Sequence, residues 1–378
     1  MRAPAKSVAL VGTYPPTACG LATFTSNLRA AIAAPRCGWD ASVVRVLDRS
    51  EPERSREVAA QWILGDAGSL RRSLAAVTSC DAVLLQHEYG LFGGPDGVDV
   101  LDLVDGLAAP LVAVMHTTLR DPSPHQREIL DHILDAAAVC VVQSEAARRR
   151  ILDVHGADAA DVVVIPHGAA ENVAGPVPSG MPRPLVLTWG LLGPGKGIEH
   201  GIAAVARLQR HAPAASYVVA GQTHPKVRAA HGERYRESLE ELARSLGVAG
   251  RVRFDDGYRD WDSLRALVRS ADVVLLPYES RDQVSSGVLV EAVASAKPVV
   301  ATRFPHAAEL LAGGAGILVD QGDVGAMADA LGRVLYEPGL AVEMADVARR
   351  VAEPLLWPAV GDAYRALVDQ VAAARAVA

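Results

Sequence analysis

Residues 271–299 read ADVVLLPYESRDQVSSGVLVEAVASAKPV, and this stretch decides the class of fold. Its run at 273–276 is short, wholly apolar and rich in β-branched residues, and Pro277 follows it. Such a run is typical of a strand that is buried on both faces of a parallel sheet. After a polar loop, a helix is predicted from about Ser286 to Ala296, before Pro298. The stretch therefore predicts a strand–loop–helix unit of an α/β fold.

The start of this predicted helix is suited to an anion. Ser286 at the N-cap satisfies orphan backbone N–H groups, and Gly287 lets a ligand approach the backbone. The free N–H groups and the helix dipole favour a negative group such as a diphosphate. Glu291 lies about one turn further along, where its carboxylate can accept two hydrogen bonds from a vicinal diol such as a ribose. An ordinary capped core helix with a solvated Glu explains the same residues, because capping is common.

Length and composition indicate a globular protein of two or three domains. The chain has 378 residues, of which 50% are hydrophobic and 21% are charged, a balance unlike that of disordered chains. The net charge of -7 and the lack of a basic stripe interleaved with aromatic residues argue against a nucleic-acid partner.

Cysteine usage and hydropathy predict the compartment. The four Cys residues are scattered and form no CxxC pair, so neither a metal site nor a disulfide framework is expected. This cysteine usage is typical of a protein in the reducing cytosol. No apolar run approaches membrane-spanning length, and the first residues lead directly into a predicted strand without a signal peptide. We expect a soluble, cytoplasmic protein.

Residues 1–170 alternate between strands and helices, which predicts a doubly wound parallel sheet. The predicted strands are the apolar runs at 7–12, 42–47, 82–85, 111–115, 139–142 and 162–165, and the predicted helices include 70–77, 126–136 and 145–154. After the first strand, the loop TYPPTACG at 13–20 and a helix at about 23–33 resemble a phosphate-handling turn. The GxGxxG spacing is absent, which disfavours a dinucleotide cofactor.

Polar side chains follow three of these strands. They form the clusters Gln86-His87-Glu88-Tyr89, His116-Thr117-Thr118 and Pro166-His167-Gly168. Ligands of such sheets bind beyond the carboxyl ends of the strands, so the set predicts a neutral or cationic polar pocket for a hydroxylated substrate. Any one His alone is more simply explained as a strand-end cap or a surface residue.

A second strand–helix alternation begins after a Pro/Gly/Ser-rich stretch that predicts a linker and hinge at 171–184. Its predicted strands are 185–189, 216–220, 252–254, 273–276, 298–301 and 316–319, and its predicted helices are 198–209, 235–246, 264–270, 286–296, 306–311 and 324–336. The second domain is predicted at 185–355. The tail at 356–378 is predicted to form an amphipathic helix with a docking role, because the second sheet is already complete without it. Two doubly wound domains joined by a hinge place the ligand cleft between them.

The second domain opens with GLLGPGKG at 190–197, which fits the first seven positions of a Walker A loop. The eighth position needs a Ser or Thr hydroxyl for Mg²⁺, and here it is Gly197. No apolar strand ends in the Asp that such an enzyme needs for its metal, so an NTPase is disfavoured. What remains is a glycine turn with Lys196 as a point charge for a diphosphate, or a solvated loop Lys.

Together these motifs resemble the family-4 retaining glycosyltransferases of GT-B fold, over nearly the whole chain. That family carries two Glu residues separated by seven others. Glu291 matches the second, which binds the nucleotide ribose in the family, and the first falls on Gln283. An amide can hydrogen-bond sugar hydroxyls, but it supplies no negative charge to an oxocarbenium-like transition state.

The resemblance assigns further residues. The backbone of Ser286, Gly287, Val288 and Leu289 matches the segment that meets the donor sugar and phosphate, and Gly20 matches the glycine loop of the first domain. His116 matches the His that touches the donor sugar, and Lys196 matches the diphosphate Lys. The family Arg five residues before that Lys is Leu191, so either Lys196 acts with helix N-termini alone, or Arg281 or His224 compensates. The family Asn is replaced by His167.

The resemblance implies transfer of a hexosyl group from a nucleoside diphosphate sugar, of the GDP-mannose or UDP-glucose type, to an acceptor hydroxyl with retained configuration. No cofactor and no metal are expected, and the leaving phosphate oxygen itself deprotonates the acceptor. His116, Lys196 and Gln283 are the predicted catalytic residues. The acceptor, a sugar-containing or hydroxylated small molecule, is expected to contact His87, Glu88 and Tyr89 with the loop at 91–94.

Two other functions remain open at this stage. A pseudo-enzyme would bind sugar nucleotide without turnover, and the missing Glu and Arg favour it. A nucleotide-sugar epimerase of similar two-domain build would need no acceptor. Membrane association is expected to be peripheral at most, because the basic cluster at 148–150 is explained as well by a solvated helix face.

Overall fold

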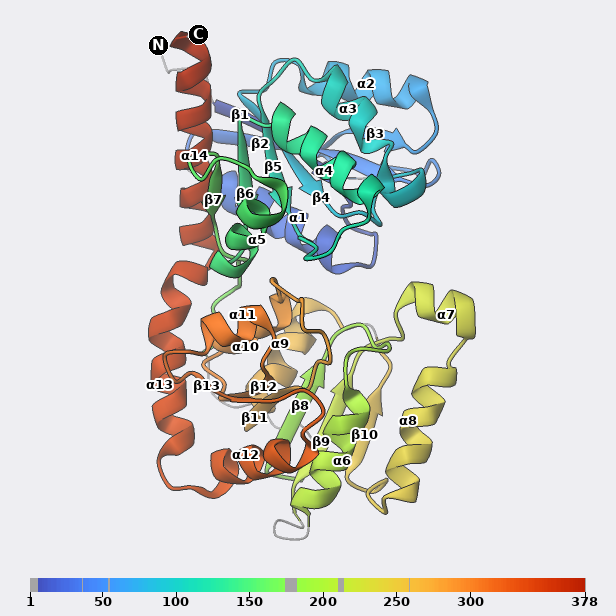
Figure 1. Cartoon of the computed structure of the whole chain (residues 1–378), viewed down its shortest axis with the longest axis vertical. Helices are drawn as coiled ribbons and strands as arrows, with labels where there is room; N and C mark the ends of the chain where they lie inside the picture. The colour runs from blue at the N-terminus through green and yellow to red at the C-terminus, as the bar shows by residue number, and fades with distance from the viewer. Residues whose placement is uncertain are drawn as a thin grey trace. The chain divides into compact units, whose positions relative to one another are not determined.

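Two parallel β-sheets organise the chain, one of seven strands and one of six (Figure 1). They belong to separate units: Met1–Gly168 with Trp357–Ala378, and Ala169–Leu356. The computed structural model describes residues 6–35, 37–53, 55–173, 182–209, 214–257 and 259–377. The predicted fold of two doubly wound α/β sheets is confirmed.

The sheet of the first unit has the strand order β3-β2-β1-β4-β5-β6-β7, and its neighbouring strands pair in parallel. The strands are β1 (Lys6–Gly12), β2 (Trp39–Leu47), β3 (Val58–Ile63), β4 (Ala82–His87), β5 (Leu111–Met115), β6 (Val139–Val142) and β7 (Val162–Val164). The helices are α1 (Gly20–Ile32), α2 (Ala67–Val77), α3 (Val100–Gly106), α4 (Pro124–Ala136), α5 (Glu145–His155) and α14 (Trp357–Val377), with a 3-10 turn η1 (Pro95–Gly97).

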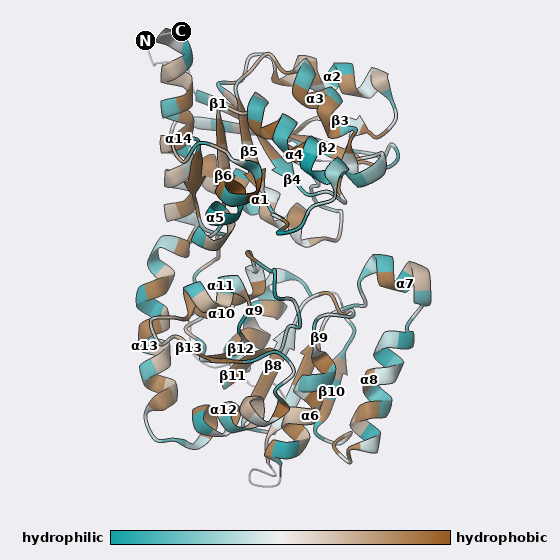
Figure 2. Ribbon diagram, viewed as in Figure 1, coloured by the Kyte–Doolittle hydropathy of each residue, from teal (hydrophilic) through white to brown (hydrophobic). Residues whose placement is uncertain are grey.

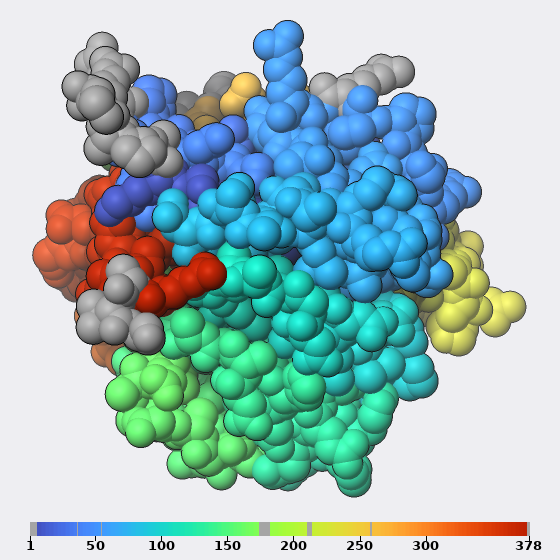
Figure 3. Space-filling view, turned by 90° about the horizontal axis from the view of Figure 1, so that it is seen from above, coloured from blue at the N-terminus to red at the C-terminus, as the bar shows by residue number. Residues whose placement is uncertain are grey.

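Helix α14 completes the core of this first unit although it follows the second unit in sequence. Val360, Tyr364 and Val368 are buried with Phe24 and Leu28 of α1 in one apolar cluster. α14 lies beside α1 and β1, and the space-filling view shows the red C-terminal segment against the dark blue start of the chain (Figures 1 and 3). Burial of this apolar surface is what holds the helix on the sheet.

The sheet of the second unit has the order β10-β9-β8-β11-β12-β13, again with parallel pairs. The strands are β8 (Leu185–Trp189), β9 (Ser216–Ala220), β10 (Val252–Asp255), β11 (Val273–Leu276), β12 (Val299–Thr302) and β13 (Gly316–Val319). The helices are α6 (Ile198–Leu208), α7 (Pro225–His231), α8 (Arg234–Ser245), α9 (Trp261–Ser270), α10 (Gly287–Ala294), α11 (Pro305–Leu310), α12 (Val324–Tyr336) and α13 (Leu340–Ala352), with η2 (Glu353–Leu355). Figure 2 shows hydrophobic residues in strands such as β8 and hydrophilic ones along α4 and α8.

The segment after Gly168 is anchored to the second unit, which corrects the predicted start of the linker. Ala169 donates to the carbonyl of Leu355 at 2.8 Å and forms a bridge with Leu356. The buried Asn172 amide donates to Ser295 Oγ at 3.1 Å and accepts from Arg269 at 2.6 Å. The predicted linker therefore begins with residues that are packed, because a buried amide needs partners. Residues 174–181 of the predicted linker lie outside the described residues.

Sequence patterns missed one strand and several helices. β3, α3, α7 and α13 were not predicted, whereas β5, β6, β8, β9, β11 and β13 have the predicted bounds. β3 is mostly half-buried or exposed and so lacks the continuous apolar run that identifies a central strand. α7 has no buried residue and thus no apolar stripe to detect.

Candidate active site

The loop between β8 and α6 requires glycine at its last position. Gly197 has φ +62, and a Cβ there would lie 1.9 Å from the carbonyl oxygen of Pro277. A Ser or Thr would meet both a steric clash and an unfavourable backbone conformation. The hydroxyl that a Walker A loop uses for Mg²⁺ therefore does not fit here, which gives the physical reason why an NTPase was disfavoured.

Lys196 is held over an aromatic ring in this loop. Its Nζ lies 4.3 Å from the ring centroid of Tyr278, which is 1% exposed and stacks on Phe304 at 5.3 Å. A cation above a ring face is stabilised by the ring's electrons. Burial lowers the pKa of Lys196, so this ammonium is poorly solvated and gains from an anionic partner.

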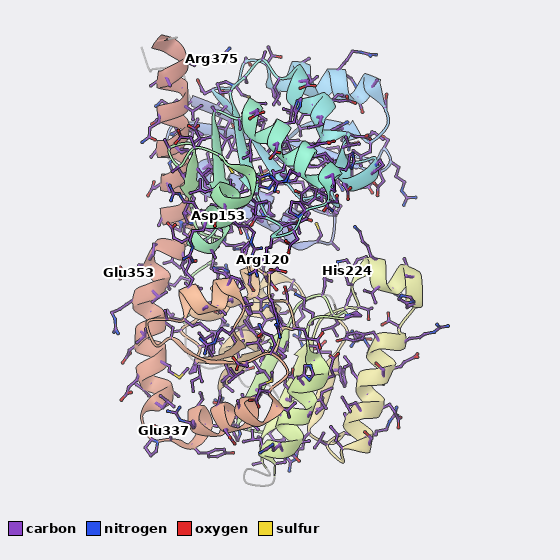
Figure 4. All side chains as sticks on the ribbon, in the orientation of Figure 1. Arg120, Asp153, His224, Glu337, Glu353 and Arg375 are labelled. Atoms are coloured by element: carbon purple, nitrogen blue, oxygen red, sulfur yellow. The ribbon has the colours of Figure 1, made fainter. Side chains whose placement is uncertain are left out.

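His224 is the N-cap residue of α7 (Figure 4), and Lys196 is close enough to act on it electrostatically. Its backbone N–H donates to the carbonyl of Leu192 at 2.8 Å, and its Nδ1 accepts from the N–H of Lys226 at 3.2 Å. Burial, Lys226 and Lys196 together lower the pKa of His224. Its Nε2–H can therefore donate as a neutral group. Arg281, the other candidate to replace the missing Arg, is exposed.

The first turn of α10 offers backbone donors. Ser286 Oγ accepts from the N–H of Leu289 at 3.3 Å, and the N–H of Ser286 donates to His306 Nδ1 at 2.9 Å. The N–H groups of Gly287 and Val288 begin the helix and have no intrahelical acceptor. Gln283 is bound locally, since its amide nitrogen donates to the carbonyl of Ser285 at 3.0 Å. This capped turn is the predicted anion site.

Glu291 lines a pocket within the second unit. The pocket is formed by Ala170, Asn172, Trp261, Leu264, Arg265, Val268, Glu291 and Ser295. Trp189 Nε1 donates to Glu291 Oε2 at 3.3 Å. Burial raises the pKa of Glu291 to about 7, against the opposite effects of Trp189 and Arg265. A carboxylate that is poorly solvated and holds one fixed donor is suited to accept hydroxyl hydrogens from a ligand.

His116 is enclosed at the carboxyl edge of the first sheet. Its Nε2 lies 2.8 Å from Gln86 Oε1, and its Nδ1 lies 3.1 Å from Gln143 Nε2. Burial, followed by the nearby His167 and His87, lowers the pKa of His116 to about 3. His116 is thus neutral at physiological pH, which is one of the two charge states predicted for this pocket. Both of its ring nitrogens are hydrogen-bonded to glutamine side chains.

The prediction that His87 contacts an acceptor is wrong. His87 is 0% exposed, because β4 extends two residues beyond the predicted strand end and carries this side chain into the core. Its ring lies edge-on to Tyr89 at 5.0 Å, and burial lowers its pKa to about 4. Tyr89 is also buried, and its hydroxyl donates to the carbonyl of Gln126 at 3.2 Å. Glu88 is the accessible member of the cluster, and it accepts a hydrogen bond from Thr117.

The glycine loop of the first unit ends at the exposed Gly20, where α1 begins. Cys19 caps this helix, its Sγ accepting from the N–H of Ala22 at 3.3 Å. The loop is tied to β2 by Arg45, which is 1% exposed and donates to Thr17 Oγ1 at 3.2 Å. Sequence reasoning missed Arg45, although an Arg in an otherwise apolar strand is a signal that a buried cation has a partner.

The basic cluster of α5 is largely structural. Arg150 is buried and donates to the carbonyl of Thr118 at 2.7 Å, and Arg148 donates to the carbonyls of Val162 and Ala159. Arg149 is exposed. Two of the three cations are therefore committed to backbone carbonyls rather than to a lipid surface. Within the described residues, no helix is both long and apolar enough to cross a membrane, and no group of three or more His, Cys, Asp or Glu side chains is arranged to hold a metal ion.

Two parallel sheets, with a lysine loop and a capped helix start in the second, are the arrangement expected of a GT-B fold. Residues 19–171 match the family model described as Glycosyltransferase Family 4, and residues 183–337 match Glycosyl transferases group 1. A D-inositol 3-phosphate glycosyltransferase of Kineococcus radiotolerans is 31% identical over 77% of this chain and 73% of its own length. The chain belongs to the family 4 glycosyltransferases, as the resemblance predicted.

Further relatives and solved structures agree with this family and fold. A GDP-mannose-dependent alpha-(1-6)-phosphatidylinositol monomannoside mannosyltransferase of Mycolicibacterium smegmatis is 31% identical over 61% of this chain and 61% of its own length. A sucrose-phosphate synthase of Thermosynechococcus elongatus superposes with a TM-score of 0.76 and 20% identity, covering 98% of this chain and 100% of that one. Anabaena HepE in complex with UDP superposes with a TM-score of 0.76 and 19% identity, covering 97% of this chain and 100% of that one.

Proposed function

We propose that this glycosyltransferase transfers a hexosyl group from a nucleoside diphosphate sugar to an acceptor hydroxyl, with retained configuration and without a metal ion. The observation that carries the proposal is the arrangement of Lys196 over Tyr278, in the same unit as the capped start of α10 and the Glu291 pocket. These groups match the charge, the oxygen atoms and the diol of a nucleoside diphosphate.

The leaving group is the part of the donor that most needs stabilisation. As the bond between the sugar carbon and the phosphate oxygen breaks, negative charge grows on the diphosphate. Lys196 supplies a positive charge, the N–H groups of Gly287 and Val288 supply donors, and His224 supplies a neutral N–H. We assign His224, rather than Arg281, the place of the missing Arg because of its position beside Lys196.

The acceptor hydroxyl loses its proton as its oxygen bonds to the sugar carbon. In our proposal that proton passes to the departing phosphate oxygen on the same face, so no protein carboxylate is required at Gln283. The Gln283 amide contributes hydrogen bonds to the sugar. On the acceptor side we retain Glu88 with Thr117 as its partner, and Tyr89 as a buried support for the loop.

The donor is of the GDP-mannose or UDP-glucose type. The relatives support this range, since one is named as GDP-mannose-dependent and HepE was solved with UDP. The acceptor is a sugar-containing or hydroxylated small molecule. The name of the D-inositol 3-phosphate glycosyltransferase supports a polyol as one class to test.

A panel of GDP, UDP and ADP and their hexose conjugates tests this function, with a chelator present. We expect a thermal shift of several degrees with one nucleotide, its loss in Glu291→Ala, and release of that nucleotide from its sugar when an acceptor is added. The anomeric configuration of the product, read by NMR, tests retention. No shift with any nucleotide would refute the donor site, and turnover that requires added Mg²⁺ would refute the metal-free reaction.

A pseudo-enzyme is the second candidate, favoured by the local hydrogen bond of Gln283 and by Leu191. It predicts the same thermal shift with no nucleotide release under any acceptor. An epimerase is the minor alternative, and it predicts conversion of one nucleotide sugar into another without an acceptor.

A further inference from the structure

Three side chains form one hydrogen-bonded row along the carboxyl edge of the first sheet. Gln86 belongs to β4, His116 follows β5 and Gln143 follows β6, and these strands are neighbours. The imidazole lies between the two amides, at 2.8 Å and 3.1 Å. Phe24 of α1 contacts the same ring edge-on, with centroids 4.8 Å apart and planes at 84°. The orientation of His116 is thus fixed from three sides.

The two amides select one tautomer of the imidazole. An amide oxygen only accepts and an amide nitrogen only donates. Gln86 Oε1 therefore needs a proton on Nε2, while Gln143 Nε2 needs a lone pair on Nδ1. Both needs are met by the same neutral form. A second proton on Nδ1 would point at the N–H of Gln143, so the row opposes the imidazolium.

The side-chain amides of Gln86 and Gln143 are both buried, and Gln86 is hydrogen-bonded to His116. Gln86 is 0% exposed, and its Nε2 has no hydrogen-bond partner among the residues that the structure describes. An unpaired buried N–H costs about 1–3 kcal/mol. Among the described residues, His116 is the one hydrogen-bond partner of the Gln86 side chain. Gln143 is also buried. An arrangement kept at such a cost at the end of a strand indicates that the state of the imidazole matters.

We propose that Gln86 and Gln143 are positioning residues that hold His116 as a neutral, Nε2-protonated imidazole, which neither gains nor loses a proton during transfer. The proposal rests on the proposed function for its kinetic consequence only. A neutral ring places no positive charge beside a sugar carbon that itself becomes positive in the transition state. The other titratable groups that act on His116 are His167 and His87, whose pKa values burial lowers to about 4.

Gln143→Glu tests the proposal directly. Its carboxylate would accept a proton from Nδ1, so both ring nitrogens would become donors and His116 would be protonated. NMR of histidine-labelled protein should show His116 titrating above about pH 6 in the variant and below about pH 4 in the wild type. His167 serves as the internal reference, and loss of one resonance in His116→Gln assigns the signal. Gln209→Glu, the same change at a half-buried amide of the other unit, should leave the titration of His116 unchanged.

The pH dependence of kcat then shows whether Gln143 positions His116 or only supports the fold. We expect kcat of Gln143→Glu to be about tenfold or more lower near pH 6 than near pH 9, with no such slope in the wild type. Gln86→Glu, which places its carboxylate at Nε2–H, should shift the titration in the same direction if Gln143→Glu does not fold. A wild-type His116 that titrates between about pH 5 and 8, or a titration unmoved in both Glu variants, would overturn the proposal. If the wild type shows no transfer, the proposed function fails, and the NMR result still decides the state of His116.

Discussion

The carboxyl edges of the two sheets differ in how they handle charge. In the first unit, three histidines at or near this edge have pKa values that burial lowers to about 3 or 4, so these side chains are polar but uncharged. In the second unit, Lys196 and Glu291 are both poorly solvated, next to a capped helix start. The same fold therefore has one edge whose histidines are neutral, here called the neutral edge, and one edge with a poorly solvated cation and carboxyl group, here called the charged edge. The difference lies in a few residues after the strands, as expected when function resides in sites rather than folds.

The largest effect is expected when the loop of the charged edge is altered. Gly197→Ser should lower the free energy of unfolding by about 4 kcal/mol or more, because its Cβ would overlap the Pro277 carbonyl at 1.9 Å. Urea denaturation measures this change. Gly156→Ser is the matched control: Gly156 has φ +67 and ψ 20, the same left-handed conformation as Gly197, with no atom within 4 Å, so it should lose only about 1–2 kcal/mol. Equal losses in the two variants would show that the clash is not what excludes Ser.

Removal of the Lys196 ammonium should show whether ligand binding at the charged edge depends on its positive charge. Lys196→Ala should weaken nucleoside diphosphate binding about 10- to 100-fold, the range for a charged hydrogen bond. Calorimetry with the nucleotide that binds best measures it. Lys226→Ala removes an exposed cation from α7 and should change the affinity less than about twofold. A comparable loss in both variants would mean that general attraction, rather than the Lys196 position, binds the diphosphate.

The raised pKa of Glu291 gives the charged edge a dependence on pH that the neutral edge lacks near pH 7. Because the folded pKa, about 7, exceeds the ordinary value of 4.5, folding favours the protonated carboxyl. The stabilisation is present in full at acid pH below the ordinary value and is lost as pH rises through 7. It amounts to about 3 kcal/mol. Urea midpoints of the ligand-free protein at several pH values should show this slope, and Glu291→Gln should reduce it. Nucleoside binding should strengthen over the same interval, since the ionised form accepts from the diol.

The smallest effects concern the basic cluster beside the neutral edge. Arg150→Ala should destabilise the first unit by about 1–3 kcal/mol, because the buried Thr118 carbonyl loses its donor. Arg149→Ala should change stability by less than about 0.5 kcal/mol, since its side chain is exposed. Thermal unfolding of the two variants measures these changes and shows whether each Arg supports the fold. Arg149→Ala that abolished binding to anionic vesicles, with stability intact, would assign the cluster to a membrane surface.

Sequence patterns predicted the sheets well where the physics is local. β8 and β11 are buried at every position, and their bounds follow from burial on both faces. The helix start at Ser286 and the lysine loop also follow from local chemistry. The state of His116 could not be predicted, since it depends on Gln86 and Gln143, which long-range pairing of β4, β5 and β6 brings together. His87 was misplaced for a related reason: β4 continues two residues beyond the predicted end, and its neighbours bury all six of its residues.

The position of α14 sets an order for synthesis. The first unit emerges from the ribosome first, yet its core includes Val360, Tyr364 and Val368, which are made only after the whole second unit. Until α14 is made, the apolar face of the first sheet that this helix covers is exposed to water. The second unit already has all its strands at that stage and can fold. A translation pause or a premature stop ahead of α14 would leave an intact second unit attached to an incomplete first one. The first unit therefore depends on a helix that is made only after the whole second unit.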